Sequence, residues 1–455
     1  MSTPAGAPRE DSAPAVRPWL GGEAARTLLW RDGAALSAAA FAARAGRVAA
    51  QLPADAGALI NLCESRGAFL LAFAAALRTG LPTLLLPART PAALHAVQQR
   101  WPTAVAVHEP GAGHELGGVA LAALRMDGPM PEASASPWPL LDAARVALVG
   151  HTSGSTGPPQ THAKTLGALW ASNAANRARI AAKLGVRFNV LATVPPQHMY
   201  GIELSVLLPL LGEAAVADAQ PLLPADVAAE LRRLPAPRLL ATTPLHLRAL
   251  LESRLELPCE AIVSATAPLD TELARAAEAH SRAPLIEVYG STETCVVATR
   301  RSAREVLWTP YPGVELQPQP DGVRVRAPQL DAPVLLGDLI ERSPDGRFAL
   351  VGRVADLIEI AGKRASLADL TRQLLAIPGV EDGVIVQHET ADAAGARRLA
   401  ALVVAPTRSE AELRAELRRR FDAAFLPRPL KRVERLPRNA LGKLPHTAVW
   451  ALLRV

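Results

Sequence analysis

Short apolar runs that alternate with helix-length segments limit the possible folds of this chain more than any other feature. The first unit has an apolar run at 59–62, a segment with helical character at 67–78 and a second run at 83–86. Because two strands joined by a helix usually pair in parallel, this unit predicts a parallel sheet. Further strand-like runs follow at 146–149, 190–194, 239–241, 261–264 and 285–289. The sequence therefore predicts a large α/β body of parallel sheets and helices.

The pattern changes after Gly313. Short alternating pieces at 314–316 and 323–326, separated by turn-forming residues, predict a small antiparallel β subdomain. A compact α+β segment follows from about Val354, with a helix expected over 410–420. We predict three regions, namely a disordered Pro/Ala/Ser-rich stretch at 1–18, a core domain at 19–353 and a small C-terminal domain at 354–455.

Charge, cysteine content and hydropathy exclude several classes of protein. The net charge is +6, but no aromatic residues are interleaved with the basic residues near the C-terminus, which argues against a nucleic-acid module. That basic patch suits an acidic partner, a nucleotide phosphate or plain solvation equally well. The 3 cysteines lie far apart, so neither a disulfide framework nor a zinc site is indicated. No leader peptide or membrane span is visible, and a cytoplasmic location is expected.

A Ser/Thr/Gly-rich segment at 152–157, with the sequence TSGSTG, directly follows the run at 146–149. Its glycines and hydroxyl groups leave backbone N–H groups open to an anion and add O–H donors. The segment lacks the Gly-Lys-Ser/Thr of a Walker loop and the spacing of a dinucleotide fingerprint. It predicts a phosphate-binding loop, although an ordinary polar loop can have the same composition.

Three further motifs carry chemistry. The segment YGSTET at 289–294 ends a predicted strand, and its Glu293 could hold Mg²⁺ or belong to a plain polar turn. Asp338 can accept hydrogen bonds from both hydroxyls of a ribose, and Arg353 can lie against the same sugar. A loop that begins at Leu436 presents Lys443 ahead of a last short helix.

In this order, the four motifs resemble those of the adenylate-forming superfamily, which includes acyl- and aryl-CoA synthetases, nonribosomal-peptide adenylation domains and firefly luciferase. The similarity extends over about residues 36–446. Members of the superfamily join a carboxylic acid to the AMP part of ATP, release pyrophosphate and pass the acyl group to a thiol. The resemblance implies an AMP-forming acid–thiol ligase that uses ATP and Mg²⁺.

The resemblance also implies roles for individual residues in nucleotide binding. Lys443, Glu293 and Thr292 would be catalytic, with Lys443 between the α-phosphate and the substrate carboxylate, Thr292 on the α-phosphate and Glu293 on the metal. The remaining nucleotide-binding residues would be Thr152, Ser153, Gly154, Ser155, Thr156, Gly157, Tyr289, Gly290, Asp338 and Arg353.

Other residues are assigned by the same resemblance to the acyl pocket and to the second half-reaction. His198 and Gly201, in the segment at 195–201, and Ser264 and Thr266 would border the acyl pocket. The mobile C-terminal domain would rotate about a hinge at Ala355 and bring Gly362, Lys363 and Arg364 to the site for thiolation. The weaker candidates Thr243 and His246 are expected to be a helix start and a surface residue.

The chain departs from the superfamily pattern at two positions. Ala355 replaces the usual hinge aspartate or lysine, and Gln160 replaces a lysine that normally follows the phosphate loop. Lys164, four residues after Gln160, is a candidate substitute. These departures keep open the alternative of an inactive nucleotide-binding scaffold.

The short length and the segment THAKT at 161–165 resemble stand-alone ligases of aryl polyene and xanthomonadin pathways. Those enzymes load a hydroxybenzoate or related aryl acid onto an acyl carrier protein. The resemblance therefore implies an aryl acid as substrate and a carrier protein as acceptor. An acyl- or aryl-CoA ligase that uses free coenzyme A is the alternative.

Overall fold

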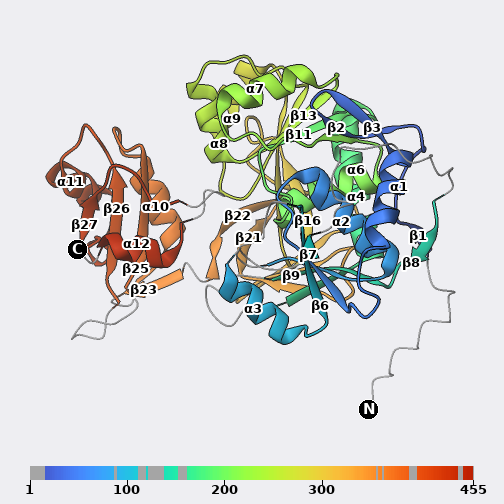
Figure 1. The fold of residues 1–455 in the computed structure, drawn as a ribbon. Coiled ribbons are helices and arrows are strands. Elements are labelled where there is room, and N and C mark those ends of the chain that lie inside the picture. The colour runs from blue at the N-terminus through green and yellow to red at the C-terminus, as the bar shows by residue number, and fades with distance from the viewer. Residues whose placement is uncertain are drawn as a thin grey trace, which may run out of the picture. The chain divides into compact units, whose positions relative to one another are not determined.

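The computed structural model describes residues 16–86, 90–110, 119–120, 138–151, 161–354, 357–360, 363–388, 397–438 and 444–453. The chain divides into two compact units (Figure 1). Unit 1 contains residues 1–305, 311–313 and 327–332, and unit 2 contains residues 306–310, 314–326 and 333–455. In this division the antiparallel hairpins group with the C-terminal residues. The domain boundary at residue 354 stays a prediction.

Unit 1 contains two sheets with parallel strands at their centres. The first has the order β10-β9-β5-β4-β6-β7, in which β4 pairs in parallel with β5 and β6, and β9 pairs in parallel with β5. Only β10 runs antiparallel to its neighbour among these pairs. The strands are β4 (Ala58–Asn61), β5 (Thr83–Leu84), β6 (Ala104–His108), β7 (Val119–Ala120), β9 (Val146–His151) and β10 (Thr161–Thr165).

The second sheet of unit 1 runs in the order β16-β15-β14-β13-β11-β12-β2-β3. Its inner strands pair in parallel, while β16 and β3 run antiparallel to their neighbours. The strands are β2 (Thr27–Arg31), β3 (Ala34–Ser37), β11 (Asn189–Ala192), β12 (Ala215–Ala217), β13 (Arg238–Thr242), β14 (Ala261–Ser264), β15 (Leu285–Ser291) and β16 (Cys295–Arg300). The parallel α/β fold predicted from the alternating runs is confirmed.

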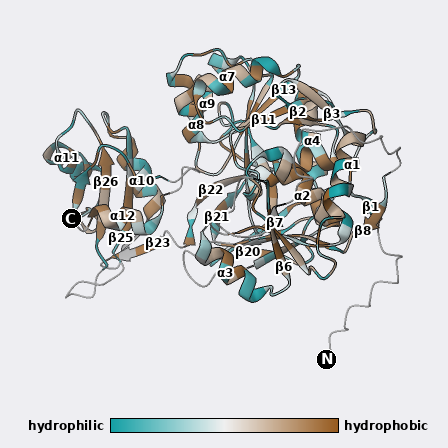
Figure 2. Cartoon of the chain, in the orientation of Figure 1, coloured by the Kyte–Doolittle hydropathy of each residue, from teal (hydrophilic) through white to brown (hydrophobic). Residues whose placement is uncertain are grey.

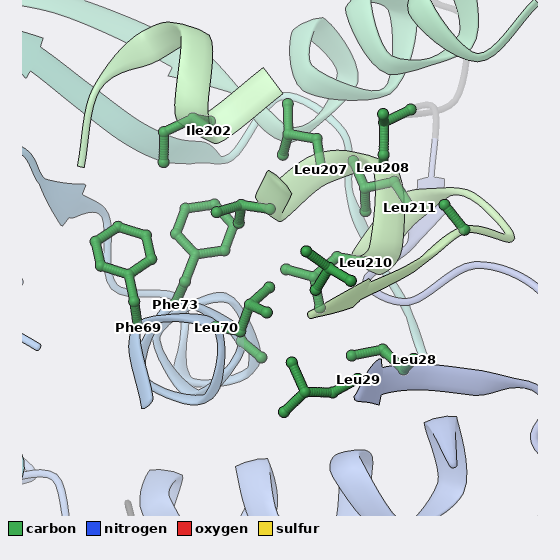
Figure 3. Packing of buried hydrophobic residues seen from close by; sticks show 14 of the residues in the cluster. Leu28, Leu29, Phe69, Leu70, Phe73, Ile202, Leu207, Leu208, Leu210 and Leu211 are labelled. Atoms are coloured by element: carbon green, nitrogen blue, oxygen red, sulfur yellow. The ribbon is translucent and has the colours of Figure 1, made fainter. Parts of the chain in front are cut away.

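Helix α2 (Arg66–Thr79) lies at the centre of the main core, because its sequence is apolar on every side. Ser65 caps its first turn, and Gly80 ends it in the left-handed conformation at φ +82°. Figure 3 shows Leu70 and Phe73 of α2 pointing toward the leucines at 207–211, with Leu28 and Leu29 of β2 beside them.

Most of the longer helices of unit 1 have exposed polar residues on one side and cover the sheets, whereas the short helix α6 is fully buried. Figure 2 shows hydrophilic stretches on outer helices such as α3 and α7, whereas the strands are largely hydrophobic. Residues 202–207 form a π-helical segment, η3. The helices are α1 (Ala38–Ala49), α3 (Pro91–Arg100), α4 (Leu166–Leu184), α5 (Met199–Gly201), α6 (Leu208–Leu211), α7 (Pro224–Arg233), α8 (Pro244–Glu252) and α9 (Thr271–Ser281).

Unit 2 contains short antiparallel sheets and an α+β part with its own core. Strand β26 lies between β25 and β27, and α10, α11 and α12 belong to the same part. The helix expected over 410–420 is confirmed as α11. The strands are β17 (Thr309–Pro310), β18 (Glu315–Gln319), β19 (Gly322–Arg326), β20 (Val334–Leu336), β21 (Asp338–Arg342), β22 (Phe348–Arg353), β23 (Leu357–Ile360), β24 (Lys363–Ser366), β25 (Asp382–Gln387), β26 (Leu399–Val404) and β27 (Leu430–Arg432), and the helices are α10 (Leu367–Leu375), α11 (Glu410–Arg420) and α12 (His446–Leu453).

The N-terminal segment requires one correction. Residues 16–18, which composition predicts to lack order, form strand β1 (Val16–Pro18) and pair antiparallel with β8 (Leu140–Asp142). The partner strand lies far along the chain, so the local composition of residues 1–18 carries no sign of the pairing. None of the helices that the structure describes combines the length and apolar character needed to cross a membrane.

Candidate functional site

The turn between β15 and β16, which carries Thr292 and Glu293, is held by its own polar side chains. The backbone N–H of Ser291 donates to Thr294 Oγ1 at 3.2 Å, and the N–H of Thr294 donates back to Ser291 Oγ at 3.2 Å. A Cβ atom on Gly290 would lie 2.1 Å from the carbonyl oxygen of Cys295, so only glycine allows this close approach. Thr292 and Glu293 are half-buried at the tip of a turn with a fixed shape.

This turn packs against the β9–β10 hairpin, which flanks the predicted phosphate loop. Strand β9 ends at His151 and β10 begins at Thr161, on either side of the loop. A Cβ atom on Gly150 would lie 2.7 Å from Thr292 Cγ2. The His162 ring lies 3.7 Å from the Glu293 carboxylate. The fold therefore brings the YGSTET motif beside the strands that enter and leave the TSGSTG motif.

Lys164 joins the two elements by a direct hydrogen bond. Its Nζ donates to the carbonyl oxygen of Glu293, and the residue is only 5% exposed. The hypothesis that Lys164 replaces the missing phosphate-binding lysine is therefore wrong for this arrangement, because its ammonium group is buried and bonded to the turn. Gln160 lies outside the described residues, as do the predicted phosphate-binding residues 152–157.

The surroundings of Glu293 fit the prediction that its carboxylate binds Mg²⁺ together with a nucleotide. Among the residues that the structure describes, no group of three or more His, Cys, Asp or Glu side chains could hold a metal ion. Mg²⁺ in phosphoryl-transfer sites is typically held by one or two carboxylates together with the substrate phosphates. A partly exposed carboxylate beside the strands that flank the predicted phosphate loop fits that mode.

The predicted acyl-pocket residues lie where parallel strands of the second sheet end. His198 immediately precedes α5, and a Cβ atom on Gly201 would lie 1.9 Å from the carbonyl oxygen of Pro195, so the segment closes tightly on itself. Ser264 ends β14, is fully buried, and its hydroxyl has no hydrogen-bond partner among the described residues. Thr266 follows with φ +81°. Ligands of α/β proteins bind outside the carboxyl ends of such strands.

Tyr200 ties the His198 segment to the neighbouring strand ends. Its hydroxyl lies 3.1 Å from the carbonyl oxygen of Thr242 and 2.8 Å from that of Val263. Since Val263 directly precedes Ser264, the bond fixes the segment at 195–201 relative to the end of β14. Sequence reasoning did not single out Tyr200, although the residue stands inside the motif that carries His198 and Gly201.

His246 is a second residue whose position sequence reasoning misjudged. Thr243 is the helix start that was expected, since its side chain accepts from the backbone of His246 at the beginning of α8. The prediction of a surface position for His246 is wrong, because its ring is half-buried and its Nδ1 lies 2.8 Å from Thr193 Oγ1. Burial lowers the pKa of His246, which favours the neutral ring. Thr193 also bonds Thr242 at 3.0 Å, so hydroxyls gather where β11 and β13 end.

In unit 2, Asp338 and Arg353 are neighbours. Asp338 on β21 and Arg353 on β22 are opposite each other in the antiparallel pair, and Arg353 Nε donates to Asp338 Oδ1 at 2.8 Å. The arginine side chain is 63% exposed, whereas that of the aspartate is 12% exposed. The fold thus brings the two predicted ribose-binding residues together within this unit.

Tyr289 lies on β15 and is half-buried, whereas several other predicted residues are not described. Ala355, Gly362 and Lys443 lie outside the described residues. The backbone of Lys363 and Arg364 belongs to β24, and their side chains lie outside the described part. Their assigned roles, like those of the other site residues, stay predictions.

Comparison with known proteins identifies the family. Residues 19–326 match the family described as AMP-binding enzyme. The 4-coumarate–CoA ligase of Halorhodospira halophila is 30% identical over 320 residues, which cover 65% of this chain and 74% of that protein. Subunit 3 of the surfactin synthase of Bacillus subtilis is 34% identical over 111 residues, which cover 24% of this chain and 8% of that protein.

Solved structures share the fold at low sequence identity. The o-succinylbenzoate coenzyme A synthetase of Bacillus subtilis, solved with ATP and a magnesium ion, has a TM-score of 0.76 and 20% identity, with 92% of this chain and 95% of that chain covered. This likeness confirms the predicted fold class, a large N-terminal α/β domain followed by a small C-terminal domain. The family match confirms the resemblance inferred from the four motifs.

Proposed function

We propose, since this chain belongs to the AMP-binding enzyme family, that it activates an aryl carboxylic acid with ATP and passes the acyl group to the phosphopantetheine thiol of an acyl carrier protein. The chain is an enzyme of the AMP-forming acid–thiol ligase class. We propose the identity of the acid, the identity of the thiol acceptor and the role of each site residue. A cytoplasmic location and membership of an aryl polyene pathway stay predictions.

One observation carries the proposal, namely the packing of the Thr292–Glu293 turn on the β9–β10 hairpin. This packing supports a common site in which the phosphate loop and the Glu293 carboxylate bind one nucleotide. Mg²⁺, when bound, would neutralise phosphate charge and favour the departure of pyrophosphate. Glu293 would hold that ion, and the Thr292 hydroxyl would donate to the α-phosphate. Two anions can then approach each other at lower electrostatic cost.

The chemistry balances in two steps. In the first, a carboxylate oxygen of the acid attacks the α-phosphorus, an O–P bond forms and the bond to pyrophosphate breaks. In the second, a thiolate attacks the acyl carbonyl carbon and AMP leaves. Lys443 would neutralise charge in the first step, and the Asp338–Arg353 pair would hold the ribose. The segment at 362–364 would serve the second step after rotation about Ala355.

The relatives support an aryl acid more directly than a carrier protein. The curated relative and the solved neighbour described above are both named for acids that contain an aromatic ring. Both names also specify coenzyme A, which favours a CoA ligase as the second candidate function. The carrier-protein acceptor rests on the resemblance to short stand-alone ligases. Basic side chains such as Arg418 and Arg435 suit the acidic surface of a carrier protein and the phosphates of coenzyme A.

Acid-dependent ATP–pyrophosphate exchange tests the first half-reaction. The panel should contain hydroxybenzoates, 4-coumarate and fatty acids of several lengths. Exchange with aryl acids supports the proposal, and exchange with fatty acids alone refutes the aryl assignment. Binding of ATP without exchange on any acid indicates the inactive scaffold.

A second assay separates the two acceptors. Preformed aryl-adenylate is supplied with either holo carrier protein or coenzyme A, and thioester formation is followed by mass spectrometry. Transfer to the carrier protein at low micromolar concentration supports the proposal. Transfer to coenzyme A alone establishes the CoA-ligase alternative.

A further inference from the structure

A buried polar cluster lies beneath the Thr292–Glu293 turn and is not explained by the motifs. At its centre, the Glu203 carboxylate of η3 is 1% exposed. It accepts hydrogen bonds from Ser172 Oγ at 2.9 and 2.8 Å and from Asn176 Nδ2 at 2.5 Å, both on α4. Tyr311 extends the cluster, since its hydroxyl donates to Asn176 Oδ1 at 2.9 Å. Such complete satisfaction is what a carboxyl group in a protein interior requires.

Lys164 supplies the positive charge of this cluster. It interacts electrostatically with Glu203, and both residues are almost fully buried. Burial raises the pKa of Glu203, while Ser172, Cys295 and Lys164 act in the opposite direction. Since a lone charge is costly in the interior, each of the two groups offsets the cost of burying the other.

The same lysine reaches the turn. Its Nζ donates to the carbonyl oxygen of Glu293, the residue whose carboxylate is proposed to hold Mg²⁺. At the far end of the turn, the Cys295 side chain interacts electrostatically with Glu203. Cys295 has φ +60°, a conformation that is strained for a residue with a side chain and needs support from its surroundings. The cluster thus binds the turn directly through Lys164 and borders the strained residue Cys295.

We propose that Lys164 and Glu203 are positioning residues, which fix the Glu293 turn so that its carboxylate meets a nucleotide-bound divalent cation. This inference rests on the proposed function. Lys164 binds the main chain of Glu293, and Glu203 interacts electrostatically with Lys164 from the buried cluster. The pair therefore acts through the turn and not on the reacting atoms. Partners of metal-ligating residues typically contribute 10- to 100-fold in metal affinity.

The test compares variants by cation binding. The double variant Lys164→Met/Glu203→Gln removes both charges together, keeps the side-chain volumes similar and leaves an amide to bond Ser172 and Asn176. Lys164→Arg keeps a cation that can donate to the carbonyl. Arg26→Met is the matched control, because Arg26 is also a buried cation that donates to backbone carbonyls, those of Gly21, Thr27, Pro209 and Ala214.

Binding of Mn²⁺ in the presence of a non-hydrolysable ATP analogue is measured by electron paramagnetic resonance, and folding is followed by circular dichroism. We expect the double variant to fold and to bind Mn²⁺ at least tenfold more weakly, while its affinity for the metal-free analogue changes less than twofold. Lys164→Arg should recover part of the loss. Arg26→Met should lower the melting temperature and leave Mn²⁺ binding unchanged.

Two outcomes overturn the positioning role alone, and a third overturns the proposed function together with it. A folded double variant with parental Mn²⁺ affinity makes the cluster a structural core element only. If Arg26→Met loses as much Mn²⁺ affinity as the double variant, the weaker Mn²⁺ binding is a general consequence of lower stability. If the parent protein shows no nucleotide-dependent Mn²⁺ binding, the proposed function itself fails, and the positioning role falls with it.

Discussion

Gly150→Ala tests the contact between the β9–β10 hairpin and the Thr292 turn. The added Cβ atom would lie 2.7 Å from Thr292 Cγ2, whereas its next neighbour, the carbonyl oxygen of His162, is 3.9 Å away. Carbon atoms in favourable contact are about 3.5–4.0 Å apart. Thr292 must therefore move by about 1 Å, and no other described residue near Gly150 needs to move.

The size of the expected effect follows from this displacement. Overpacking in a dense interior costs about 1–3 kcal/mol in the free energy of unfolding. A shift of about 1 Å in a group that contacts the reacting phosphate can reduce the rate about 100-fold. We expect Gly150→Ala to melt a few degrees lower and to lose about 100-fold in acid-dependent ATP–pyrophosphate exchange.

A double-mutant cycle gives the clearest assay of this reasoning. Thr292→Ser removes Cγ2, the atom in conflict, and keeps the hydroxyl that is proposed to bind the α-phosphate. The combination Gly150→Ala/Thr292→Ser should recover at least tenfold in exchange relative to Gly150→Ala, a coupling of about 1.4 kcal/mol. Gly46→Ala is the control, because its Cβ atom would meet Arg78 Nη2 at an ordinary 3.5 Å. Exchange at the parental rate in Gly150→Ala, or no recovery in the double variant, would refute the argument.

Three further predictions concern charge and burial. Lys443→Ala should reduce ATP–pyrophosphate exchange by about 100-fold or more without changing the melting temperature, and transfer from preformed acyl-adenylate should survive. Equal exchange in variant and parent would contradict the catalytic role assigned to Lys443. Because burial lowers the pKa of His246, the unfolded chain takes up a proton there that the folded chain does not, so this residue reduces stability as pH falls below about 6.5. His246→Gln should therefore lose less melting temperature than the parent between about pH 7.5 and 5.5, and parallel curves would exclude that role. Arg66→Met should lower the free energy of unfolding of unit 1 by about 3 kcal/mol in urea, because the fully buried guanidinium donates to the carbonyls of Ala192 and Val194. A decrease in that free energy of less than about 1 kcal/mol would contradict this reasoning.

Most of the fold could be predicted because its longer elements are visible in the local sequence. The apolar run at 261–264 is a strand buried on both faces, and the uniformly apolar segment of α2 is a helix buried on all sides. The β1–β8 pairing could not be predicted, since its two halves are short and lie far apart in sequence. A strand of three residues has too little periodicity to be distinguished from a disordered segment.

In the candidate site, too, some residues could be predicted from the sequence and others could not. Glu293 and Asp338 could be named from the sequence, because each carboxylate stands in a short motif whose neighbouring residues already suggest its role. Lys164 was noticed but given the wrong role, because nothing in the local sequence reveals that its side chain is buried against the turn. Glu203 was missed, since a single acidic residue in an apolar stretch gains its meaning only from Ser172 and Asn176 on another helix.

The burial of helix α2 affects how unit 1 unfolds and folds. Its buried side chains share one cluster with Leu28 and Val190 of one sheet and with Leu59 and Leu148 of the other. Separation of either sheet would expose a helix that is hydrophobic around its whole circumference. Amide hydrogens of both sheets should therefore exchange with deuterium in one cooperative event, and a protein arrested before either sheet has docked would present α2 to chaperones.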